Sequence, residues 1–539
     1  MILREGRVRA VSLLAATVVL SLGLSACGGG GDNEGSSQTG GGSLTVRGMN
    51  NDWVSFDFQA NNVNHNLAAV APAYDRLLAY GPDFELIGGL AGSWEVTPAD
   101  RPTTVTFKLR QDAKCEDGTA VTPSVVAASF TRLFSVKKTT DLTKGTFGAG
   151  PFDFKADDAT WTFTFNTKTP FRDLEAGFAW GGSAIVCPAG LKALETDPKA
   201  LETKMYGSGP FTLSSATHAS EIVFKRKDAW TWGPDNTTYK TLPETLTYKY
   251  VPKDTTAANL LLTGGMDIGW AAGTDGARLK ADTSFVSKQL TNWGVWNLVF
   301  NMTPGRPTTD EALREAIGLA FDSQEYIQVV YQGQGIKTNS YLAPGMPCYD
   351  PETETIVPAT SIPEAQSVLA AAGYTLSDGK LMKDGKQVTL KATGFNFAAP
   401  AGGDYVVSQL TKLGIKVDLD PPSGYATSTV SGNFDLGIIS STSVAPLSTK
   451  SLSIYSGAAP PDGTNFGNTA AGDQELAGLI SQAYEYAGDR GCEILGQIQR
   501  LYLEKHYLRG VVAAQMQMVG KGWDFLPSQV YEVYAFKRK

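Results

Sequence analysis

Hydrophobic and polar residues alternate along several short stretches of this chain. In residues 104–110, valine, phenylalanine and leucine alternate with threonine, lysine and arginine, and in residues 160–165 tryptophan and phenylalanine alternate with threonine. Because successive side chains of a strand point to opposite faces, this period of two predicts half-buried antiparallel strands. Further strands are expected at residues 44–49, 222–225, 246–251 and 296–300.

Two helices are predicted by capping boxes, in which Ser or Thr precedes Glu by three residues. The first box is Thr308 with Glu311, and the second is Ser361 with Glu364, whose helix is expected to stop at Gly373. The first helix carries an apolar stripe at helical spacing: Leu313, Ala316, Ile317, Ala320 and Phe321. Since strands and helices are mixed along the whole length, the fold class is expected to be α/β or α+β.

The N-terminal residues have the parts of a secretory signal. Three arginines lie among the first nine residues, and an apolar core follows at residues 10–22. Residues 24–27, Leu-Ser-Ala-Cys, resemble the lipobox of bacterial lipoproteins, which implies cleavage after residue 26 and a lipid on Cys27. An uncleaved membrane anchor is the alternative, but a span needs about 20 apolar residues, and serine and glycine dilute this run. Both interpretations place the remainder on the outer face of the cell membrane, in an extracellular or periplasmic setting.

Residues 27–43 are expected to form a flexible tether, because they are mostly Gly, Ser and small polar residues without periodic apolar positions. The remaining length of about 500 residues is more than one hydrophobic core usually supports, so two or three domains are expected. The net charge of −8 becomes more negative once the arginine-rich leader is removed. An acidic body without a basic run argues against nucleic acid and against electrostatic binding to anionic lipid.

Four cysteines remain after Cys27, and an even number in a secreted protein favours two disulfides. They are Cys115, Cys187, Cys348 and Cys492. Their wide spacing does not match a zinc site, and spacing alone leaves three pairings open.

A series of short motifs runs through the body of the chain. Residues 88–96 read Gly-Gly-Leu-Ala-Gly-Ser-Trp-Glu-Val, residues 117–119 read Asp-Gly-Thr, and residues 129–132 read Ser-Phe-Thr-Arg. Further pieces lie at residues 74–78, 106–110, 207–211, 265–268, 300–301, 314–322 and 434–436. In this order they resemble the family 5 solute-binding proteins of ABC importers, which include oligopeptide-, dipeptide- and nickel-binding proteins.

The resemblance implies a periplasmic-binding-protein-like (type II) fold with two lobes, an inserted domain and a ligand cleft that closes by a hinge. The expected domains are a discontinuous first domain (44–87, 206–295 and 503–539), an inserted second domain (88–205) and a third domain (296–502). This division favours the disulfides Cys115–Cys187 and Cys348–Cys492, since each pair then lies within one domain. The implied partners are a small polar solute and the permease subunits of an ABC importer, and the protein is expected to be a monomer without a cofactor.

Ligand-binding residues are carried over from the family by position alone. Amide, hydroxyl and indole groups there suit a polar organic solute, because they form hydrogen bonds without burying a charge. The candidates are Asn61, Asn62, Val63, Trp270, Trp296, Asn297, Ser440, Ser441, Thr442 and Ser443.

One departure from the family bears on the cargo. Peptide-binding members carry Gly-Trp and then an acidic residue after the Phe-Asp-Leu piece, and that carboxylate pairs with the α-ammonium group of the peptide. Here residues 437–446 contain neither tryptophan nor an acid. Because a buried unpaired ammonium is costly, either another carboxylate replaces it or the solute is a sugar, an amide-rich metabolite or a blocked peptide. Nickel is disfavoured, since only three histidines are available and their spacing does not suggest a shared site.

Two other classes of function are considered. An extracellular lipoprotein hydrolase has little support, because no Gly-x-Ser-x-Gly elbow or His-Glu-x-x-His helix is present. A receptor that reports ligand occupancy to a membrane sensor would share the same fold. The sequence therefore favours a solute receptor that is not an enzyme.

Overall fold

The structure is a computed structural model, and it describes residues 41–48, 51–138, 143–290, 294–397, 400–441, 447–460, 462–527 and 532–539. The lipobox with Cys27, almost all of the tether, Thr442 and Ser443 lie outside the described residues. Residues Thr39–Lys539 form one compact unit. Within its described part, no helix has the length and apolar character needed to cross a membrane.

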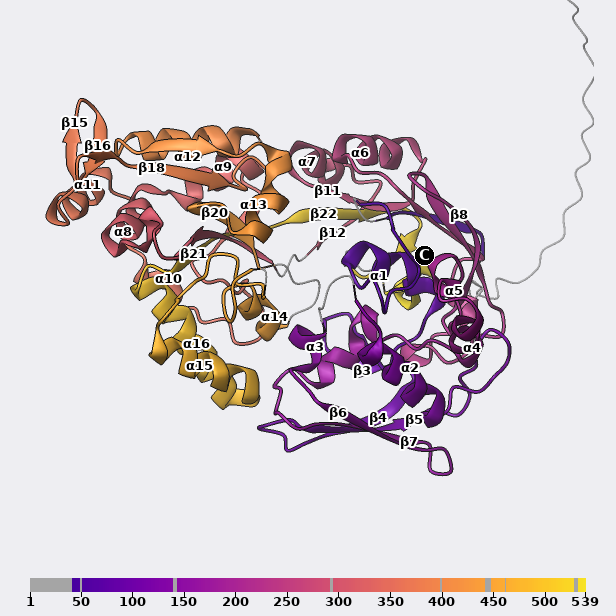
Figure 1. Cartoon of the computed structure of the whole chain (residues 1–539). Coiled ribbons are helices and arrows are strands. Elements are labelled where there is room, and N and C mark those ends of the chain that lie inside the picture. The colour runs from indigo at the N-terminus through magenta and orange to yellow at the C-terminus, as the bar shows by residue number, and fades with distance from the viewer. Residues whose placement is uncertain are drawn as a thin grey trace, which may run out of the picture. The chain divides into compact units, whose positions relative to one another are not determined.

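A mixed seven-stranded sheet contains strands from both ends of the compact unit (Figure 1). The C-terminal strand β22 lies between β12 and β11, and β1 pairs in parallel with both β11 and β10. Three of these strands contain the segments predicted near residues 44, 222 and 246. The order is β12 (Val286–Leu290), β22 (Met516–Gly520), β11 (Ile268–Ala271), β1 (Ser43–Arg47), β10 (Thr245–Lys249), β9 (Glu221–Arg226) and β8 (Phe211–Thr217). The helices α6 (Asp254–Thr263) and α7 (Gly273–Ala281) pack on it.

A second, four-stranded sheet is antiparallel, and its two central strands are those predicted from the period of two. Its order is β4 (Ala91–Thr97), β5 (Thr104–Leu109), β7 (Thr162–Thr167) and β6 (Phe152–Asp157). The helix α2 (Pro123–Ser135) packs against β6 and β7. The Phe130 ring of α2 contacts Phe163, Phe165 and Phe178, and the cluster contains nine phenylalanines: 107, 130, 134, 147, 152, 154, 163, 165 and 178.

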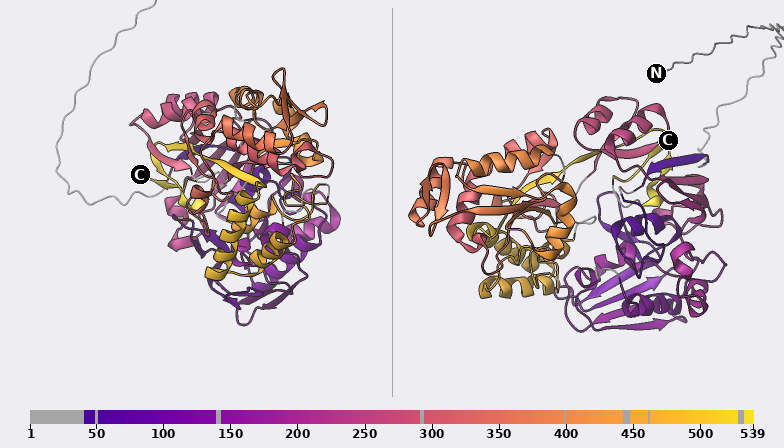
Figure 2. Two further views of the ribbon diagram at one scale, coloured as in Figure 1. Left: turned by 90° about the vertical axis from the view of Figure 1, so that its left-hand side faces the viewer. Right: turned by 45° about the horizontal axis from the view of Figure 1, so that its top comes forward.

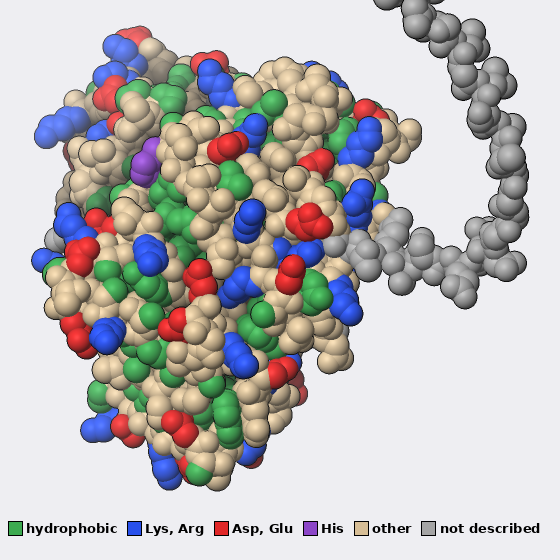
Figure 3. All heavy atoms as spheres, turned by 90° about the vertical axis from the view of Figure 1, so that its right-hand side faces the viewer, with side chains coloured by type: hydrophobic (Ala, Val, Ile, Leu, Met, Phe, Trp, Pro, Cys, Tyr) green, Lys and Arg blue, Asp and Glu red, His purple; other side chains and the backbone are tan. Residues whose placement is uncertain are grey.

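The seven- and four-stranded sheets share one hydrophobic core, and we call this part, residues 41–290 and 516–539, the first lobe. It also contains α1 (Asn64–Val70), α3 (Lys144–Phe147), η3 (Gly181–Ser183), α4 (Pro188–Thr196) and α5 (Ala200–Thr203). The face of the first lobe shown in Figure 3 carries basic and acidic side chains side by side. This face therefore presents no continuous basic surface of the kind that nucleic acids select.

The second lobe, residues 294–514, is built on a six-stranded sheet. Its order is β14 (Gly335–Lys337), β21 (Leu508–Ala514), β13 (Val295–Phe300), β20 (Leu436–Ser440), β18 (Thr389–Thr393) and β19 (Lys416–Leu419). In β13, Leu298 and Phe300 face a core with the first helix group, and Val295 and Val299 face a core with the second. The first group is α8 (Glu311–Ala320), α9 (Ser323–Tyr331), α11 (Ile362–Ala371) and α12 (Pro400–Thr411), and the second is α14 (Ser448–Ser453), α15 (Gln474–Glu485) and α16 (Gly488–Glu504).

The two predicted helix starts have different outcomes. Ser361 caps α11 as predicted, because its Oγ accepts a hydrogen bond from the Glu364 N–H. For α8 the predicted cap is wrong: the carboxylate of Asp310 accepts from the Ala312 N–H. Thr308 instead donates its hydroxyl to the carbonyl of Asn301, so it joins the start of the helix to β13.

The chain passes between the lobes twice, once between β12 and β13 and once between β21 and β22 (Figure 2). The domain boundary expected near residue 503 is corrected by this topology, because β21 still pairs with β13 in the second lobe. The return to the first lobe occurs between Ala514 and Met516. Sequence pattern did not distinguish β21 from β22, since both are apolar strands separated by a single residue.

Both disulfides lie within one lobe each. Cys115 is bonded to Cys187 in the first lobe, and Cys348 is bonded to Cys492 in the second. These are the two pairs that the domain division favours. They close loops of 72 and 144 residues in the sequence. In the chain-entropy model, cross-links of this length destabilise the unfolded chain by about 4–5 kcal/mol each.

The Gly-Ser-Gly-Pro motif at residues 207–210 is explained by packing. A Cβ on Gly207 would lie 2.1 Å from the carbonyl oxygen of Ala73, and one on Gly209 would lie 2.6 Å from the carbonyl carbon of the same residue. Only glycine permits this approach of two backbones. The motif therefore fixes the start of β8 against the segment after α1.

Candidate functional site

Three aromatic side chains meet at one end of the six-stranded sheet. Phe397 follows β18, Trp296 lies at the start of β13, and Tyr425 is the first residue of α13 (Tyr425–Ser431). The ring centroids are 4.9 Å apart for Phe397 and Tyr425, and 5.9 and 6.3 Å from Trp296 to Phe397 and Tyr425. Phe397 is 53% exposed, and it is the one aromatic ring among the exposed large apolar side chains of the described residues. We call these three residues the aromatic patch.

The aromatic patch lies where an α/β sheet usually binds ligands. The strands β18 and β20 are parallel, so their carboxyl ends meet at the same edge. Ligands of open α/β sheets bind outside this edge. Figure 1 shows α13 and β20 on the side of the second lobe that is nearest to the first.

Of the four predicted positions on β13 and β20 that the structure describes, two belong to this edge. Trp296 and Ser440 are paired in register and both are partly exposed. Burial raises the pKa of Tyr425 to about 12, against the opposite effect of its hydrogen bond with the Ser440 backbone. The phenol is therefore neutral at physiological pH and is suited to hydrogen bonding.

The other two positions are core residues. Asn297 is fully buried, and its Nδ2 donates to the carbonyl of Val295 at 2.7 Å and to the Tyr455 hydroxyl at 2.8 Å. Ser441 is also fully buried, and its Oγ lies 3.0 Å from both the Val295 N–H and the Tyr341 carbonyl. Both side chains hold the strands together and are not available to a solute.

In the first lobe, the predicted residues Asn61, Asn62 and Val63 lead into α1. The chain just before them is held by Asp57, because the Arg132 guanidinium donates to both of its carboxylate oxygens, at 2.6 and 3.0 Å. Asn62 is fully buried, whereas Asn61 and Val63 are partly exposed. The Asn61 Oδ1 atom is itself buried, without a hydrogen-bond partner in the described part of the chain.

The helix α1 places this segment beside Trp180. Leu67 of α1 packs on Gly181, where an added Cβ would lie 3.3 Å from the leucine Cβ. Trp180 comes directly before Gly181 and is 5% exposed. The structure thus packs α1, which follows Asn61 and Val63 in the chain, against the residue next to an indole that was not selected from the sequence.

Trp270 is placed in the core of the first lobe. It is 1% exposed, and the Arg47 guanidinium lies 4.9 Å from its ring centroid while donating to its backbone carbonyl. A cation held over an indole and a buried position both indicate a packing role. The structure does not bring Trp270 to the aromatic patch.

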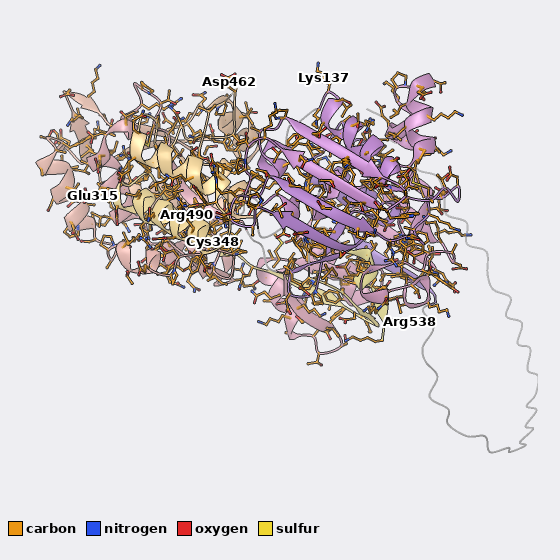
Figure 4. The ribbon with its side chains drawn as sticks, turned by 90° about the horizontal axis from the view of Figure 1, so that it is seen from below. Lys137, Glu315, Cys348, Asp462, Arg490 and Arg538 are labelled. Atoms are coloured by element: carbon orange, nitrogen blue, oxygen red, sulfur yellow. A yellow bond between two sulfur atoms is a disulfide. The ribbon has the colours of Figure 1, made fainter. Side chains whose placement is uncertain are left out.

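The two lobes touch on the side where α14 meets α3. Figure 4, seen from below, shows Cys348 and Arg490 beside the helices α15 and α16, next to the four-stranded sheet. We call this the lobe contact, and its interactions are Arg101 with Glu485, Ala487 N–H with the Asp100 carbonyl, Arg172 N–H with the Tyr484 carbonyl, and Thr449 with Asp173.

Lys450 of α14 lies within the lobe contact. Its Nζ is 5.6 Å from the ring centroid of Trp180 in the first lobe. Burial lowers the pKa of the Lys450 ammonium to about 8. The second lobe therefore carries an aromatic surface at one edge of its sheet and a partly buried cation where the lobes meet.

The histidines do not form a metal site. Among the described residues, His, Cys, Asp and Glu side chains form no group of three that could hold a metal ion. His218 stacks on Trp53 at 4.3 Å, and its Nδ1 lies 3.0 Å from the Asp52 carboxylate. Burial lowers the pKa values of His65 and His506, which belong to different lobes.

The family of the chain follows from its sequence. A family model described as bacterial extracellular solute-binding proteins, family 5, middle part, matches residues 85–461. The chain belongs to this family. The match includes the four-stranded sheet, the aromatic patch and Lys450, and it confirms the resemblance seen in the motifs and the type II binding-protein fold.

Relatives of known name agree with family 5. The probable D,D-dipeptide-binding periplasmic protein DdpA of Escherichia coli is 26% identical over 373 residues, covering 66% of this chain and 66% of that protein, which is just under two thirds of its length. A substrate-binding protein from Microbacterium hydrocarbonoxydans, solved with 4-hydroxybenzoate hydrazide, has 22% identity and a TM-score of 0.68, covering 93% and 100% of the two chains. The binding protein DppA of Helicobacter pylori, solved with the peptide STSA, has 18% identity and a TM-score of 0.76, covering 93% and 99%.

Three residues of the aromatic patch and the lobe contact were not selected from the sequence: Phe397, Tyr425 and Lys450. Phe397 and Tyr425 lie in loops or at a helix start without a motif, and only the fold brings them to Trp296. Lys450 is one of many lysines in the sequence. The signal that could have found it is its position on the short helix that follows the serine-rich segment.

Proposed function

We propose that this protein is a lipid-anchored extracellular receptor that captures a peptide or another polar organic solute between its lobes and delivers it to an ABC importer. The observation that carries the proposal is the aromatic patch, a partly exposed group of three rings at the carboxyl ends of β18 and β20. Rings of this kind supply flat apolar contact, and nearby hydroxyl and amide groups orient the solute. Family membership supports solute binding as the activity.

The connections between the lobes support a hinge. Two crossing segments join them, and a cavity of about 520 Å³ lies beside these segments. It is lined on the first lobe by residues of α7, β12 and β22, and on the second by Gly333 and Gln334. The space allows the lobes to rotate while the lobe contact opens, which would admit the solute and then exclude water from it.

The proposal includes both peptides and other polar solutes, because two observations favour different classes of solute. Names of relatives favour peptides, since the E. coli relative is named for D,D-dipeptides. The absent acid in residues 437–446 favours a solute without a free α-ammonium group. A blocked or unusual peptide, or an organic acid, is compatible with both observations.

The receptor function is tested by thermal unfolding of the mature protein with a broad panel of peptides, oligosaccharides and metabolites. A ligand that binds only the folded state stabilises it by about 2.7 kcal/mol at a hundredfold excess over Kd. We expect at least one compound to raise Tm by several degrees. No shift with any compound, together with hydrolysis of one of them, would favour the extracellular hydrolase instead.

The lipid anchor is proposed from the leader sequence and Cys27. We also propose that the rest of the chain has three domains, as the family resemblance implies, and that the chain returns to the first domain between β21 and β22. The lipid is tested by mass spectrometry of the protein purified from membranes with detergent. The wild type should carry a diacylglyceryl group, and Cys27→Ala should be released into the medium or periplasm. An unlipidated wild-type Cys27 would remove the anchor from the proposal while leaving solute binding untouched.

A further inference from the structure

The ammonium group of Lys450 has no partner in the part of the chain that the structure describes. No hydrogen bond, ion pair or further interaction involves its Nζ, apart from the contact with the Trp180 ring at 5.6 Å. The side chain is partly buried at the lobe contact. A cation removed from water without an anion is costly, so such a position is uncommon in a structural role.

Asp173 of the facing lobe, which contacts the residue before Lys450, already has other partners. The Asp173 Oδ2 accepts from both the N–H and the hydroxyl of Thr449, at 3.2 and 2.6 Å, and its Oδ1 lies 3.4 Å from the Arg172 Nε. Asp173 does not contribute to the pKa of Lys450, which is lowered by burial alone. The charge of Lys450 is therefore not compensated by the lobe contact.

A second donor lies beside this ammonium. The indole Nε1 of Trp180 is buried and has no acceptor among the described residues. Trp180 is followed by η3, on which Leu67 of α1 packs, so this indole lies in the first lobe between Lys450 and α1 in the sequence of contacts. Two donors without acceptors, one of them charged, would suit a group that only accepts hydrogen bonds.

We propose that Lys450 binds a carboxylate of the solute, so that the cargo is an organic anion such as a peptide with a free C-terminus or an aromatic acid. The inference rests on the proposed receptor function and deepens it. A monoanion fits the single cation, whereas phosphate sites use several arginines or a series of backbone N–H groups. Binding would also tie α14 of the second lobe to Trp180 of the first through the solute.

The test uses two pairs of probes that differ only in the charged group. The pairs are the dipeptide Ala-Phe with its C-terminal amide, and 4-hydroxybenzoate with 4-hydroxybenzamide. Calorimetric titration compares the wild type, Lys450→Met, Lys450→Arg and the control Lys416→Met, which removes an exposed lysine of β19. Unfolding without ligand shows whether each variant is folded.

We expect the wild type and Lys416→Met to bind the acid of one pair at least tenfold more tightly than its amide, as charged hydrogen bonds require. Lys450→Met should lose this preference and Lys450→Arg should retain it. The pair that binds decides between a peptide C-terminus and an aromatic acid. Three results would overturn the inference and leave the receptor function standing. They are equal binding of acid and amide, an acid preference that persists in Lys450→Met, and a best panel ligand without a carboxylate. Absence of binding by the whole panel would instead overturn the receptor function.

Discussion

The protein contains two groups of aromatic side chains that differ in what covers them. In the first lobe, nine phenylalanines fill the space between α2 and the four-stranded sheet, and Phe107, Phe130 and Phe163 are each at most 1% exposed. In the second lobe, the aromatic patch has the same kind of ring contacts, yet Phe397 is 53% exposed. Ring spacing is similar in both places.

The difference teaches that aromatic composition does not separate a core from a site. The phenylalanine cluster belongs to a sheet face that a helix covers, and burial of each ring stabilises the fold by a few kcal/mol. The aromatic patch lies at the edge of a sheet, where strands end, and Phe397 remains accessible. Stability is therefore expected to depend on the first group and solute binding on the second.

The largest effect is expected from Phe130→Ala in the phenylalanine cluster. Removing this ring leaves a cavity among six neighbouring rings, and such changes cost about 3–5 kcal/mol of unfolding free energy. Urea unfolding followed by circular dichroism measures the loss. A change below about 1 kcal/mol would contradict the view that this cluster supports the first lobe.

Trp270→Ala sharpens the comparison. The position of Trp270 in the family's motif order suggests a ligand-binding residue, whereas its burial indicates a core residue of the first lobe. We expect a loss of about 3 kcal/mol in unfolding free energy, since the change removes a fully buried indole and leaves the Arg47 guanidinium without its ring. The same urea experiment measures it. Full stability together with weakened solute binding would return Trp270 to the site.

Phe397→Ala should show the opposite behaviour. The ring is largely in water, so the unfolding free energy should change by less than about 1 kcal/mol. Affinity for the solute should fall about fivefold, because stacking contacts of this kind contribute of the order of 1 kcal/mol each. Calorimetric titration gives the affinity, with Leu376→Ala as the control for an exposed apolar residue far from the patch. An unchanged affinity would make the patch an ordinary surface.

A further prediction concerns the pH dependence of stability. The pKa of Lys450 is about 8 in the folded protein and 10.5 in a model peptide, so the unfolded state binds more protons between these values. The contribution of this group to folding therefore increases as pH rises from about 8 to 10.5. Comparing the unfolding free energy of the wild type with that of Lys450→Met across this range isolates the contribution. A difference that does not vary with pH would show that the ammonium is not affected by burial.

The same ionisation affects solute binding with the opposite sign. A carboxylate needs the charged form of Lys450, so its affinity should be highest below pH 8 and should fall by up to tenfold for each pH unit above it. The pH profile of the amide probe serves as the reference.

Much of the fold could be predicted because local patterns decide it. The period of two at residues 104–110 and 160–165 gave β5 and β7, and Ser361 capped its helix as expected. The predicted cap of α8 was wrong because Asp310, two residues after Thr308, can also accept a hydrogen bond from the first turn of the helix. Sequence spacing does not show which of two nearby acceptors caps a helix. The boundary near residue 503 was wrong because strand pairing between β21 and β13 is a long-range choice.

The site was less predictable than the fold. Trp296 and Ser440 lie at the expected edge, but the period of two also places their neighbours Asn297 and Ser441 on the opposite, buried side. A one-residue shift along a strand therefore separates a candidate contact from a core residue. Phe397, Tyr425 and Lys450 are joined only by folding, across distances in sequence that no short motif spans.

The most direct test of the account is the crystal structure of the protein with the solute that it retains during purification. We predict density for a small organic molecule against Trp296, Phe397 and Tyr425, enclosed between the two lobes. The central claim is that the aromatic patch, and not the phenylalanine cluster, binds the solute. A solute bound elsewhere, with these three rings left in water, would contradict it.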